Sequence, residues 1–355
     1  PIPNPQSPIP ITNKKNFSEI IFNSNPKDIA FLENLTDDSY SDILLDNTFC
    51  VFTSINKIIY FIYSNEKKSI ITIDLNNFKK ITKIKNAHNE FINNFRYHFD
   101  SQNLRDLILS ISSNDNNIKI WNFHNWECIL NLKDVYKTGE VYSSCFLNEN
   151  NQIYIVSSNY GTGINSKPIK IFDFNKNIIK EIDNNNEKVC YIDIYFDKIL
   201  CKNYLLIGNN GNVKSYDLKK NQLYYEYCDS EKKIDHSSCV INYKEIIELI
   251  ESSDDGYIRV WNFHFGQILK KIKVCESYLY GICLWNYDYL FVGCENKKIR
   301  LVDLNTGEMV KELSGHTDSV ISIKKLIIPK YGECIISQGN QSDQIKLWIY
   351  KLKNE

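Results

Sequence analysis

Residues 302–308 read Val-Asp-Leu-Asn-Thr-Gly-Glu, and residues 313–320 read Leu-Ser-Gly-His-Thr-Asp-Ser-Val. The first segment predicts the end of a β-strand and a tight turn, because Asn, Thr and Gly directly follow an apolar run. The second predicts the end of the next strand, a Gly-His loop and the start of a further strand. Another pattern occurs twice: residues 118–124 read Ile-Lys-Ile-Trp-Asn-Phe-His, and residues 258–264 read Ile-Arg-Val-Trp-Asn-Phe-His. The chain is therefore expected to consist of repeated β-rich units.

The position of the Trp in this recurring segment can be followed through seven units of the chain. Each of these positions carries an apolar or aromatic residue, and they are Ile73, Trp121, Phe172, Tyr216, Trp261, Val302 and Trp348. Their spacing is close to a period of about 40–45 residues, which is typical of four-stranded repeats. Seven units fill the chain from about residue 49 to its end, whereas six or eight do not fit.

Within one unit, the sequence predicts four short strands. The unit that begins near Tyr278 has β-rich runs at residues 280–285, 289–293, 299–304 and 309–313, separated by Asn, Asp and Gly. No segment of about 15 residues shows the apolar spacing of an amphipathic helix, so an all-β fold is expected. A four-stranded sheet cannot cover its own apolar faces, and the units are therefore expected to stack against one another in a closed ring.

These motifs resemble the WD-repeat family, and the resemblance covers nearly the whole chain beyond residue 48. It implies a seven-bladed β-propeller with four antiparallel strands in each blade. In that family, a His in the loop that leads into a blade, an Asp in the turn before the third strand and the third-strand Trp form a hydrogen-bonded chain. The matching residues are His88, Asp115 and Trp121 in the second unit, His236, Asp255 and Trp261 in the fifth, and His316 and Trp348 in the seventh. In the seventh unit, Asp343 lies one residue closer to the Trp than the pattern requires.

The last unit ends only a few residues after Trp348, which leaves no room for its outer strand. We expect the N-terminal part of the chain to supply that strand and to close the ring, from residues 17–22 or residues 28–35. The expected organisation is a Pro-rich extended arm at residues 1–16, a segment with the closing strand at residues 17–48 and seven repeats at residues 49–355. The arm is interpreted as a linker, with a docking peptide as the alternative. The absence of an initiator Met indicates a processed protein or a domain of a longer one.

The composition argues against several classes of partner. The formal net charge is −1 and the arginines are Arg96, Arg105, Arg259 and Arg300, whereas binding of nucleic acid or acidic membranes depends on a surplus of basic residues. The eleven cysteines include no Cys-x-x-Cys pair, so we expect reduced structural thiols and no metal site. No apolar run is long enough to span a membrane, and no signal peptide is seen. These features predict an intracellular protein without a cofactor, in the cytoplasm or alternatively in the nucleus or a ciliary or cytoskeletal assembly.

The sequence contains no recognisable catalytic motif. His124 and His264 each follow a third-strand Trp by three residues, which indicates equivalent turns in two blades and not two members of one site. Gly161 and Gly163 lie in a loop with no helix after it, so they do not form a dinucleotide-binding fingerprint. We therefore expect a protein that is not an enzyme.

The expected function is that of a non-enzymatic protein–protein interaction scaffold. The propeller face formed by the loops that lead into the blades, together with the turns between strands two and three, is expected to dock proteins or peptides. The candidate partner-binding residues on this face are Tyr136, Tyr160, Lys167 and Tyr278. We expect a monomer that works within a larger multiprotein complex. Two alternatives stay open: a reader of a peptide or modified tail at the mouth of the central channel and, less favoured, a propeller enzyme.

Overall fold

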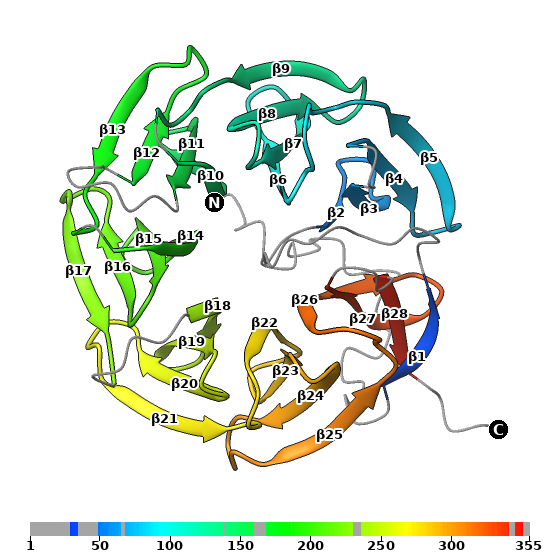
Figure 1. The fold of residues 1–355 in the computed structure, drawn as a ribbon, viewed down its shortest axis with the longest axis vertical. Helices are drawn as coiled ribbons and strands as arrows, with labels where there is room; N and C mark the ends of the chain where they lie inside the picture. Colours follow the sequence, from blue (N-terminus) through cyan, green and yellow to red (C-terminus); the bar gives the residue numbers. More distant parts are fainter. Residues whose placement is uncertain are drawn as a thin grey trace.

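The computed structural model describes residues 29–34, 49–64, 68–137, 139–159, 168–185, 187–229, 236–340 and 345–350. These residues form seven four-stranded sheets that are arranged around a central axis (Figure 1). The prediction of an all-β propeller with seven blades of four antiparallel strands is therefore confirmed. The Pro-rich arm and the first candidate for the closing strand, residues 17–22, lie outside the described residues.

The strands follow one another in chain order within each blade. Blade 1 consists of β2 (Phe49–Thr53), β3 (Ile59–Ser64), β4 (Ile70–Asp74) and β5 (Lys79–Ile84), and blade 2 of β6 (Asn94–Asp100), β7 (Arg105–Ser112), β8 (Asn117–Asn122) and β9 (Glu127–Leu132). Blade 3 consists of β10 (Val141–Glu149), β11 (Gln152–Asn159), β12 (Ile169–Phe172) and β13 (Ile178–Ile182), and blade 4 of β14 (Val189–Asp197), β15 (Lys202–Asn209), β16 (Val213–Asp217) and β17 (Gln222–Tyr227). Blade 5 consists of β18 (His236–Tyr243), β19 (Ile247–Ser253), β20 (Tyr257–Asn262) and β21 (Ile268–Lys273), and blade 6 of β22 (Leu279–Leu284), β23 (Tyr289–Cys294), β24 (Lys298–Asp303) and β25 (Met309–Ser314). Blade 7 consists of β26 (Val320–Ile328), β27 (Gly332–Gly339) and β28 (Ile345–Tyr350), with β1 (Ile29–Asn34) beside β28.

The seven positions that recur in the sequence all lie on third strands. Trp121, for example, lies on β8, Phe172 on β12 and Val302 on β24. Six of the seven side chains are buried, and Tyr216 is half-buried. This place in the blade therefore does not require an indole, because Ile, Phe, Tyr and Val are also accommodated there.

The core lies between the blades. The second and third strands are covered on both faces, as in β7, where every residue except Arg105 is buried, whereas most residues of the outer strand β21 are exposed. Neighbouring sheets share apolar clusters, and one of these clusters joins Phe61 of blade 1 to Ile336 and Leu347 of blade 7. Each blade is thus stabilised mainly by its contacts with two neighbours.

Every outer strand carries a β-bulge at the same place. In blade 2, Trp121 pairs with Cys128 and Ile120 pairs with Leu130, so that Ile129 is the extra residue on the outer strand. The same shift of register occurs beside Ile73, Phe172, Tyr216, Trp261, Val302 and Trp348. The bulge therefore belongs to this position of the blade and not to the Trp side chain.

The strand β1 has the place of a fourth strand in the sheet of blade 7. It runs antiparallel to β28, with Phe31 opposite Trp348 and Glu33 opposite Leu347. This register shift is the one found between the third and fourth strands of the other six blades. The strand lies within residues 28–35, the second of the two segments that the sequence indicates for a closing strand.

In blade 2, a serine joins the His and the Trp of the predicted network. Trp121 Nε1 donates a hydrogen bond to Ser110 Oγ at 2.8 Å, and His88 Nε2 lies 2.8 Å from the same oxygen. On the other side of its imidazole group, His88 Nδ1 lies 3.6 Å from a carboxylate oxygen of Asp115. Burial lowers the pKa of His88, which favours its neutral form. Ser110, which the sequence pattern did not single out, thus connects the loop before blade 2 to its second and third strands.

Blade 7 repeats this arrangement. Trp348 Nε1 donates a hydrogen bond to Ser337 Oγ at 2.6 Å, and His316 Nε2 lies 2.6 Å from that oxygen. Asp343 lies outside the described residues. In both blades the serine lies two residues after the residue that pairs with the Trp, which makes it a recognisable position on the second strand.

In blade 5, the structure differs from the predicted network. Among the described residues, the indole N–H of Trp261 has no hydrogen-bond partner. Glu251 occupies the place that the serine has in blades 2 and 7, so the hydroxyl acceptor is missing. His236 is the first residue of β18, with its Cα opposite that of Ser253, and so it does not lie in the loop before the strand.

A buried arginine cluster takes the place of the His–Ser–Trp contacts in blade 5. Arg259 is only 1% exposed. Its Nη2 lies 2.5 Å from Asp255 Oδ2, and its Nε lies 2.8 Å from Asp229 Oδ1 and 3.8 Å from Glu251 Oε1. Asp255 therefore contacts Arg259, and the ion pairs compensate the burial of this guanidinium group.

The hydroxyl of Ser337 is expected to stabilise blade 7. Ser337→Ala should lower the free energy of unfolding by about 1–3 kcal/mol, because it leaves the indole N–H of Trp348 and the ring of His316 buried without their shared partner. Urea unfolding monitored by circular dichroism measures this change. Ser144→Ala is the matched control, since Ser144 Oγ is buried and has no hydrogen-bond partner among the described residues. Equal losses for the two variants would contradict the assigned role of Ser337.

Candidate docking surface

The sheet order places the connections of the blades on two opposite faces of the ring. In every blade the first strand lies near the axis and the fourth at the rim (Figure 1). The turns between strands one and two and between strands three and four lie at one end of each antiparallel sheet. We call the surface formed by these turns the turn face. The opposite surface, formed by the turns between strands two and three and by the loops that lead into the next blade, is called the loop face.

Tyr136, which the sequence indicated as a partner-binding residue, is buried in the loop before blade 3. It is 5% exposed. Its hydroxyl lies 2.8 Å from Ser157 Oγ and 3.0 Å from the carbonyl oxygen of Pro168. Ser157 has the place in blade 3 that Ser110 has in blade 2. Tyr136 therefore contacts the second-strand serine of blade 3, as His88 contacts Ser110 in blade 2. The Tyr136 side chain therefore does not lie exposed on the loop face, as the sequence indicated, because its hydroxyl is hydrogen-bonded inside the blade.

The other three predicted docking residues are not brought together by the described structure. Tyr278 is 48% exposed. Its loop is fixed by Glu295, whose backbone N–H donates to the carbonyl oxygen of Tyr278 at 2.9 Å. Tyr160 and Lys167 lie outside the described residues. A role for Tyr278 on the loop face stays a prediction.

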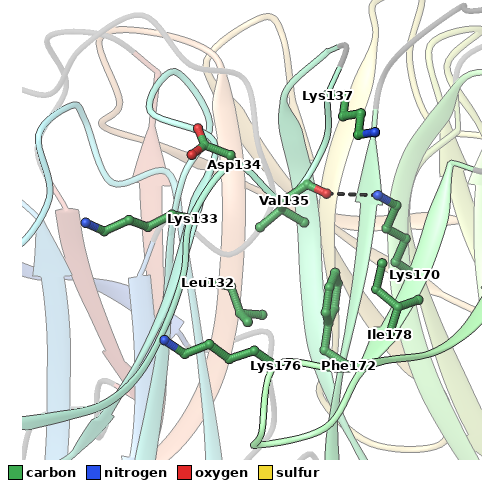
Figure 2. A pocket seen from close by; sticks show the side chains of 9 residues that line it. All are labelled: Leu132, Lys133, Asp134, Val135, Lys137, Lys170, Phe172, Lys176 and Ile178. Carbon is green, nitrogen blue, oxygen red and sulfur yellow. Dashed lines mark hydrogen bonds between the residues drawn. The ribbon is translucent and has the colours of Figure 1, made fainter.

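Lysines on the third strands tie the loop face to the blades. Lys119 Nζ donates to the carbonyl oxygen of Ala87 at 2.6 Å, and Lys170 Nζ donates to that of Val135 at 2.9 Å. Figure 2 shows the second of these bonds beside a hollow of about 270 Å³ between blades 2 and 3. Its lining also includes Lys133, Lys137 and Lys176. These three lysines are exposed, so the hollow is a solvated surface rather than an enclosed binding site.

The turn face carries a group of exposed apolar side chains on blades 4 and 5. Ile199 and Leu200, in the turn between β14 and β15, are 82% and 46% exposed. Phe265, in the turn between β20 and β21, is 72% exposed, and Ile246, between β18 and β19, is 49% exposed. We call these four residues the apolar patch. Single exposed apolar residues are common, but a group on adjoining turns indicates an interaction surface.

A buried carboxylate joins two of these turns. Asp197 is fully buried, and its Oδ1 accepts hydrogen bonds from the backbone N–H groups of Ile199 at 2.8 Å and Leu200 at 2.9 Å. His264, next to Phe265, has its Nε2 3.3 Å from Asp197 Oδ2. The contact between Asp197 and His264 therefore holds the Ile-Leu turn of blade 4 beside the Phe turn of blade 5.

Aromatic rings form the base beneath the patch. Phe263 meets Tyr195 at a centroid distance of 4.7 Å and Tyr204 at 5.2 Å, in both cases edge to face. Tyr224 adds a contact between its hydroxyl and His264 Nδ1 at 3.2 Å. Because these rings and the Asp–His contact fix the turns in advance, little ordering remains to be done when a partner binds.

The surroundings of the patch are mainly basic. Lys198 lies over the ring of Tyr243, with its Nζ 5.5 Å from the ring centroid, which places the turn of blade 4 next to the first strand of blade 5. Lys198, Lys219 and Lys220 are exposed on the turn face, and Glu245 is an exposed acid in the adjoining turn of blade 5. A partner on the patch would therefore meet more positive than negative charge.

Blades 1 and 2 contain a smaller arrangement of the same kind. His124 Nε2 lies 3.1 Å from Asp106 Oδ2, and the same oxygen accepts a hydrogen bond from the backbone N–H of Ile55 at 3.1 Å. Ile55 and Leu104 are exposed on this part of the turn face. His124 and His264 thus lie at equivalent turns of different blades, each beside its own Asp, and they do not form one site.

The apolar patch was not among the docking residues that the sequence indicated. One signal for it is visible in hindsight: Ile199 and Leu200 lie where a strand turns back, a place that Asn, Asp and Gly usually occupy. Phe265 next to Gly266 gives a second signal of the same kind. Residue types alone do not distinguish an exposed turn residue from a packed one, so neither signal identifies the patch without the structure.

Among the described residues, no group of three or more His, Cys, Asp and Glu side chains is placed to hold a metal ion. The described part of the chain contains no helix that is long and apolar enough to cross a membrane.

Comparison with known proteins gives matches to parts of the chain. Residues 79–122, from β5 to β8, match the family described as "WD domain, G-beta repeat". The U3 small nucleolar RNA-associated protein 21 homolog of Schizosaccharomyces pombe is 29% identical over 125 residues, which are 34% of this chain and 14% of the relative. Myosin heavy chain kinase C of Dictyostelium discoideum is 29% identical over 75 residues, which are 21% of this chain and 9% of the relative. The matched region is thus a small part of either relative.

The family match falls on the second repeat, and the same third-strand position and outer-strand bulge recur in all seven blades. The sheets are built in the same order throughout the ring. The chain is therefore a seven-bladed propeller with a match to the WD-repeat family at residues 79–122.

Proposed function

We propose that this propeller is a non-enzymatic scaffold that docks a partner protein on the apolar patch of its turn face. WD-repeat propellers typically act in protein interactions, which agrees with such a role. The observation that carries the proposal is the exposure of Ile199 and Phe265 on turns that Asp197 and His264 already hold together. The chain works in this proposal as one subunit of a multiprotein complex.

Phe265 and Ile199 are the expected anchors of the interface. Full burial of a side chain of this size contributes about 1.5–3 kcal/mol, and these two have the most surface left to bury. A stable interface needs roughly 800 Å² on each partner, which is more than the four side chains of the patch supply. The neighbouring turns would form the rim, while the anchors at the centre would contribute most of the binding energy.

The charge around the patch indicates the chemistry of the partner. Lys198, Lys219 and Lys220 favour a partner segment whose apolar side chains are flanked by Asp or Glu. Charged groups at the rim of an interface mainly accelerate association and fix the orientation of the partner. The proposed partner is therefore a protein with an acidic, amphipathic segment.

The Ser110, His88 and Asp115 contacts in blade 2 follow the order of a hydrolase triad, but their environment supports a structural role. Ser110 is fully buried, so a substrate has no access to its hydroxyl. Its oxygen also accepts the indole N–H of Trp121. The same burial applies to Ser337 in blade 7.

The remaining described histidines also support a role without catalysis. Burial lowers the pKa of His98 to about 4, so its ring stays neutral at physiological pH. His124 and His264 each lie beside a single Asp in separate blades. The free thiols of all eleven cysteines support an intracellular, cytoplasmic location, because reducing compartments maintain thiols.

We also propose that β1 closes the ring as the outer strand of blade 7. Its support is the register: Phe31 and Glu33 stand opposite Trp348 and Leu347 with the same bulge as the fourth strands of the other blades. Without β1, the backbone groups along one edge of β28 would lose their partners.

Removal of the closing strand is expected to destabilise the whole propeller. Deletion of residues 1–45 should lower the melting temperature in differential scanning calorimetry, because blade 7 loses a strand and blade 1 loses a well-packed neighbour. Deletion of residues 1–28 is the matched control, since it leaves β1 in place. A melting temperature that is the same for both truncated proteins would disprove the closure.

Charged substitutions in the apolar patch are expected to abolish partner binding. The double variant Phe265→Asp with Ile199→Asp should reduce affinity by about 100-fold or more, because it removes both anchors and places charge at the centre of the interface. The measurement is affinity purification of the tagged chain from its native cells, with quantitative mass spectrometry of the proteins that co-purify with it.

Two control variants define the face that binds. Ile55→Asp with Leu104→Asp makes the same change in charge at the related place on blades 1 and 2, and Tyr278→Ala probes the loop face. Both should retain the partners, and all variants should unfold at the temperature of the unmodified protein. Loss of the partners with Tyr278→Ala, together with full retention in the patch variant, would assign docking to the loop face instead.

A further inference from the structure

The hollow between blades 2 and 3 has an apolar floor to which both blades contribute. Leu132, Val135 and Phe172 line it and are buried, and they belong to the apolar cluster that the two blades share. Ile178, at the start of the outer strand β13, also lines the hollow and is 48% exposed. A ligand in the hollow would therefore contact apolar side chains of two blades at once.

The same hollow is a local site of positive charge. Its charged lining residues are Lys133, Lys137, Lys170, Lys176 and Asp134, although the whole chain has a formal net charge of −1. The ion pairs of the described residues include none of these four lysines. Their charges are therefore available to acidic groups of a ligand.

The loop that carries Val135 and Lys137 is fixed from both neighbouring blades. From blade 2, Asn116 accepts the N–H of Val135 on its carbonyl oxygen at 3.3 Å, and its Nδ2 donates to the carbonyl oxygen of Tyr136 at 2.5 Å. From blade 3, Lys170 Nζ donates to the carbonyl oxygen of Val135 at 2.9 Å and lies 4.7 Å from the ring centroid of Tyr136. This wall of the hollow therefore needs little further ordering when a ligand binds.

The turn between β12 and β13 forms the other end of the hollow, and it is fixed as well. Asp173 Oδ1 accepts the backbone N–H of Asn177 at 2.7 Å, and the N–H of Lys176 donates to the carbonyl oxygen of Asp173 at 3.2 Å. Figure 2 shows Lys137 and Lys176 at opposite ends of the hollow, with Val135 between them. Lysines thus flank the apolar floor at both ends.

The size and chemistry of the hollow favour a peptide segment over other ligands. Its volume of about 270 Å³ is below the range of about 300–1,000 Å³ that is typical of small-molecule sites. Single-stranded nucleic acid stacks its bases on exposed aromatic rings, whereas Phe172, the aromatic residue of the lining, is 5% exposed. A peptide can place one apolar side chain in the hollow while its neighbouring residues reach the lysines on either side.

We propose that this hollow is a docking groove for an extended acidic segment of a partner protein, in which an apolar side chain is flanked on both sides by Asp or Glu. The apolar side chain contacts Val135, Phe172 and Ile178, and the carboxylates on either side lie beside Lys137 and Lys176. The groove lies on blades 2 and 3, so it is separate from the apolar patch on blades 4 and 5 and does not depend on it.

Fluorescence anisotropy with a labelled peptide tests the groove. The probe is a fluorescein-labelled peptide with the central sequence Glu-Glu-Leu-Glu-Glu, titrated with the purified full chain. Lys137→Glu with Lys176→Glu should weaken its binding about tenfold or more, because like charges then face each other. The same variant should gain binding to a peptide with the central sequence Lys-Lys-Leu-Lys-Lys. Both lysines are exposed, so the variant should keep the melting temperature of the unmodified protein.

Two further variants separate the groove charge from general charge and from the apolar contact. Lys79→Glu with Lys80→Glu is the matched control, since it makes the same change at exposed lysines of β5 in blade 1, and it should bind the acidic peptide as the unmodified protein does. Ile178→Ser should weaken binding of the peptide with the central Leu, but not of a peptide with the central sequence Glu-Glu-Gly-Glu-Glu.

A photoreactive leucine analogue at the centre of the acidic peptide locates the bound segment directly. Mass spectrometry of digests should find crosslinks within residues 132–137 or 172–178. Crosslinks to Ile199 or Phe265 instead would place the peptide on the apolar patch and overturn the groove. Equal binding to the unmodified protein and to the Lys137→Glu, Lys176→Glu variant, or no measurable binding to either, would also overturn it. Tighter binding of a single-stranded DNA oligonucleotide than of the acidic peptide would assign the groove to nucleic acid.

Discussion

Each sheet of this protein has two apolar faces, and only a neighbouring sheet can cover each of them. This constraint explains why the third strands accept Trp, Phe, Tyr, Ile or Val at one position, since the position needs apolar volume and not a particular hydrogen bond. It also explains why the cluster that joins Phe61 to Ile336 and Leu347 matters for the whole ring. At that place the first blade and the last blade cover each other, so the sheets have no uncovered end.

The same constraint divides the roles of the two faces. The loops of the loop face pass over the ends of buried strands, and they carry side chains inward to the hydroxyl groups there. Tyr136, His88 and His316 all meet a serine of the second strand in this way. The turns of the turn face are shorter and are held by carboxylates such as Asp197, which leaves their apolar side chains directed outward. On this propeller, a turn side chain is therefore available to a partner where another group, such as the Asp197 carboxylate, already holds the backbone of the turn.

The sequence predicted the ring well because its strongest signals repeat seven times. The spacing of the third-strand positions was sufficient for the number of blades, and the resemblance to the WD-repeat family implied the four antiparallel strands of each blade. The serine that joins Trp121 to His88 was missed, since a Ser within a β-rich run has no distinctive pattern. Tyr136 was predicted to lie on the surface because it belongs to a loop that leads into a blade, and only its contacts with Ser157 and Pro168 show that its side chain points inward. In blade 5, Glu251 instead of a serine removed the acceptor that the motif requires, although Trp261 and Asp255 match it. The apolar patch depends on exposure and on contacts between blades, which spacing along one chain does not report.

The pairing of β1 with β28 has a consequence for the order in which the protein can be made. The first described strand of the chain and the last one stand side by side, so their contact has the longest sequence separation in the fold. Blades 1 to 6 consist of consecutive strands and can form as each repeat leaves the ribosome. Blade 7 can be completed only after β28 has been synthesised, and β1 must remain unpaired until then. Such long-range pairing is slow to form, and an unpaired strand is open to wrong partners. The proposed closure by β1 therefore predicts that a newly made chain is most exposed to aggregation before blade 7 is complete.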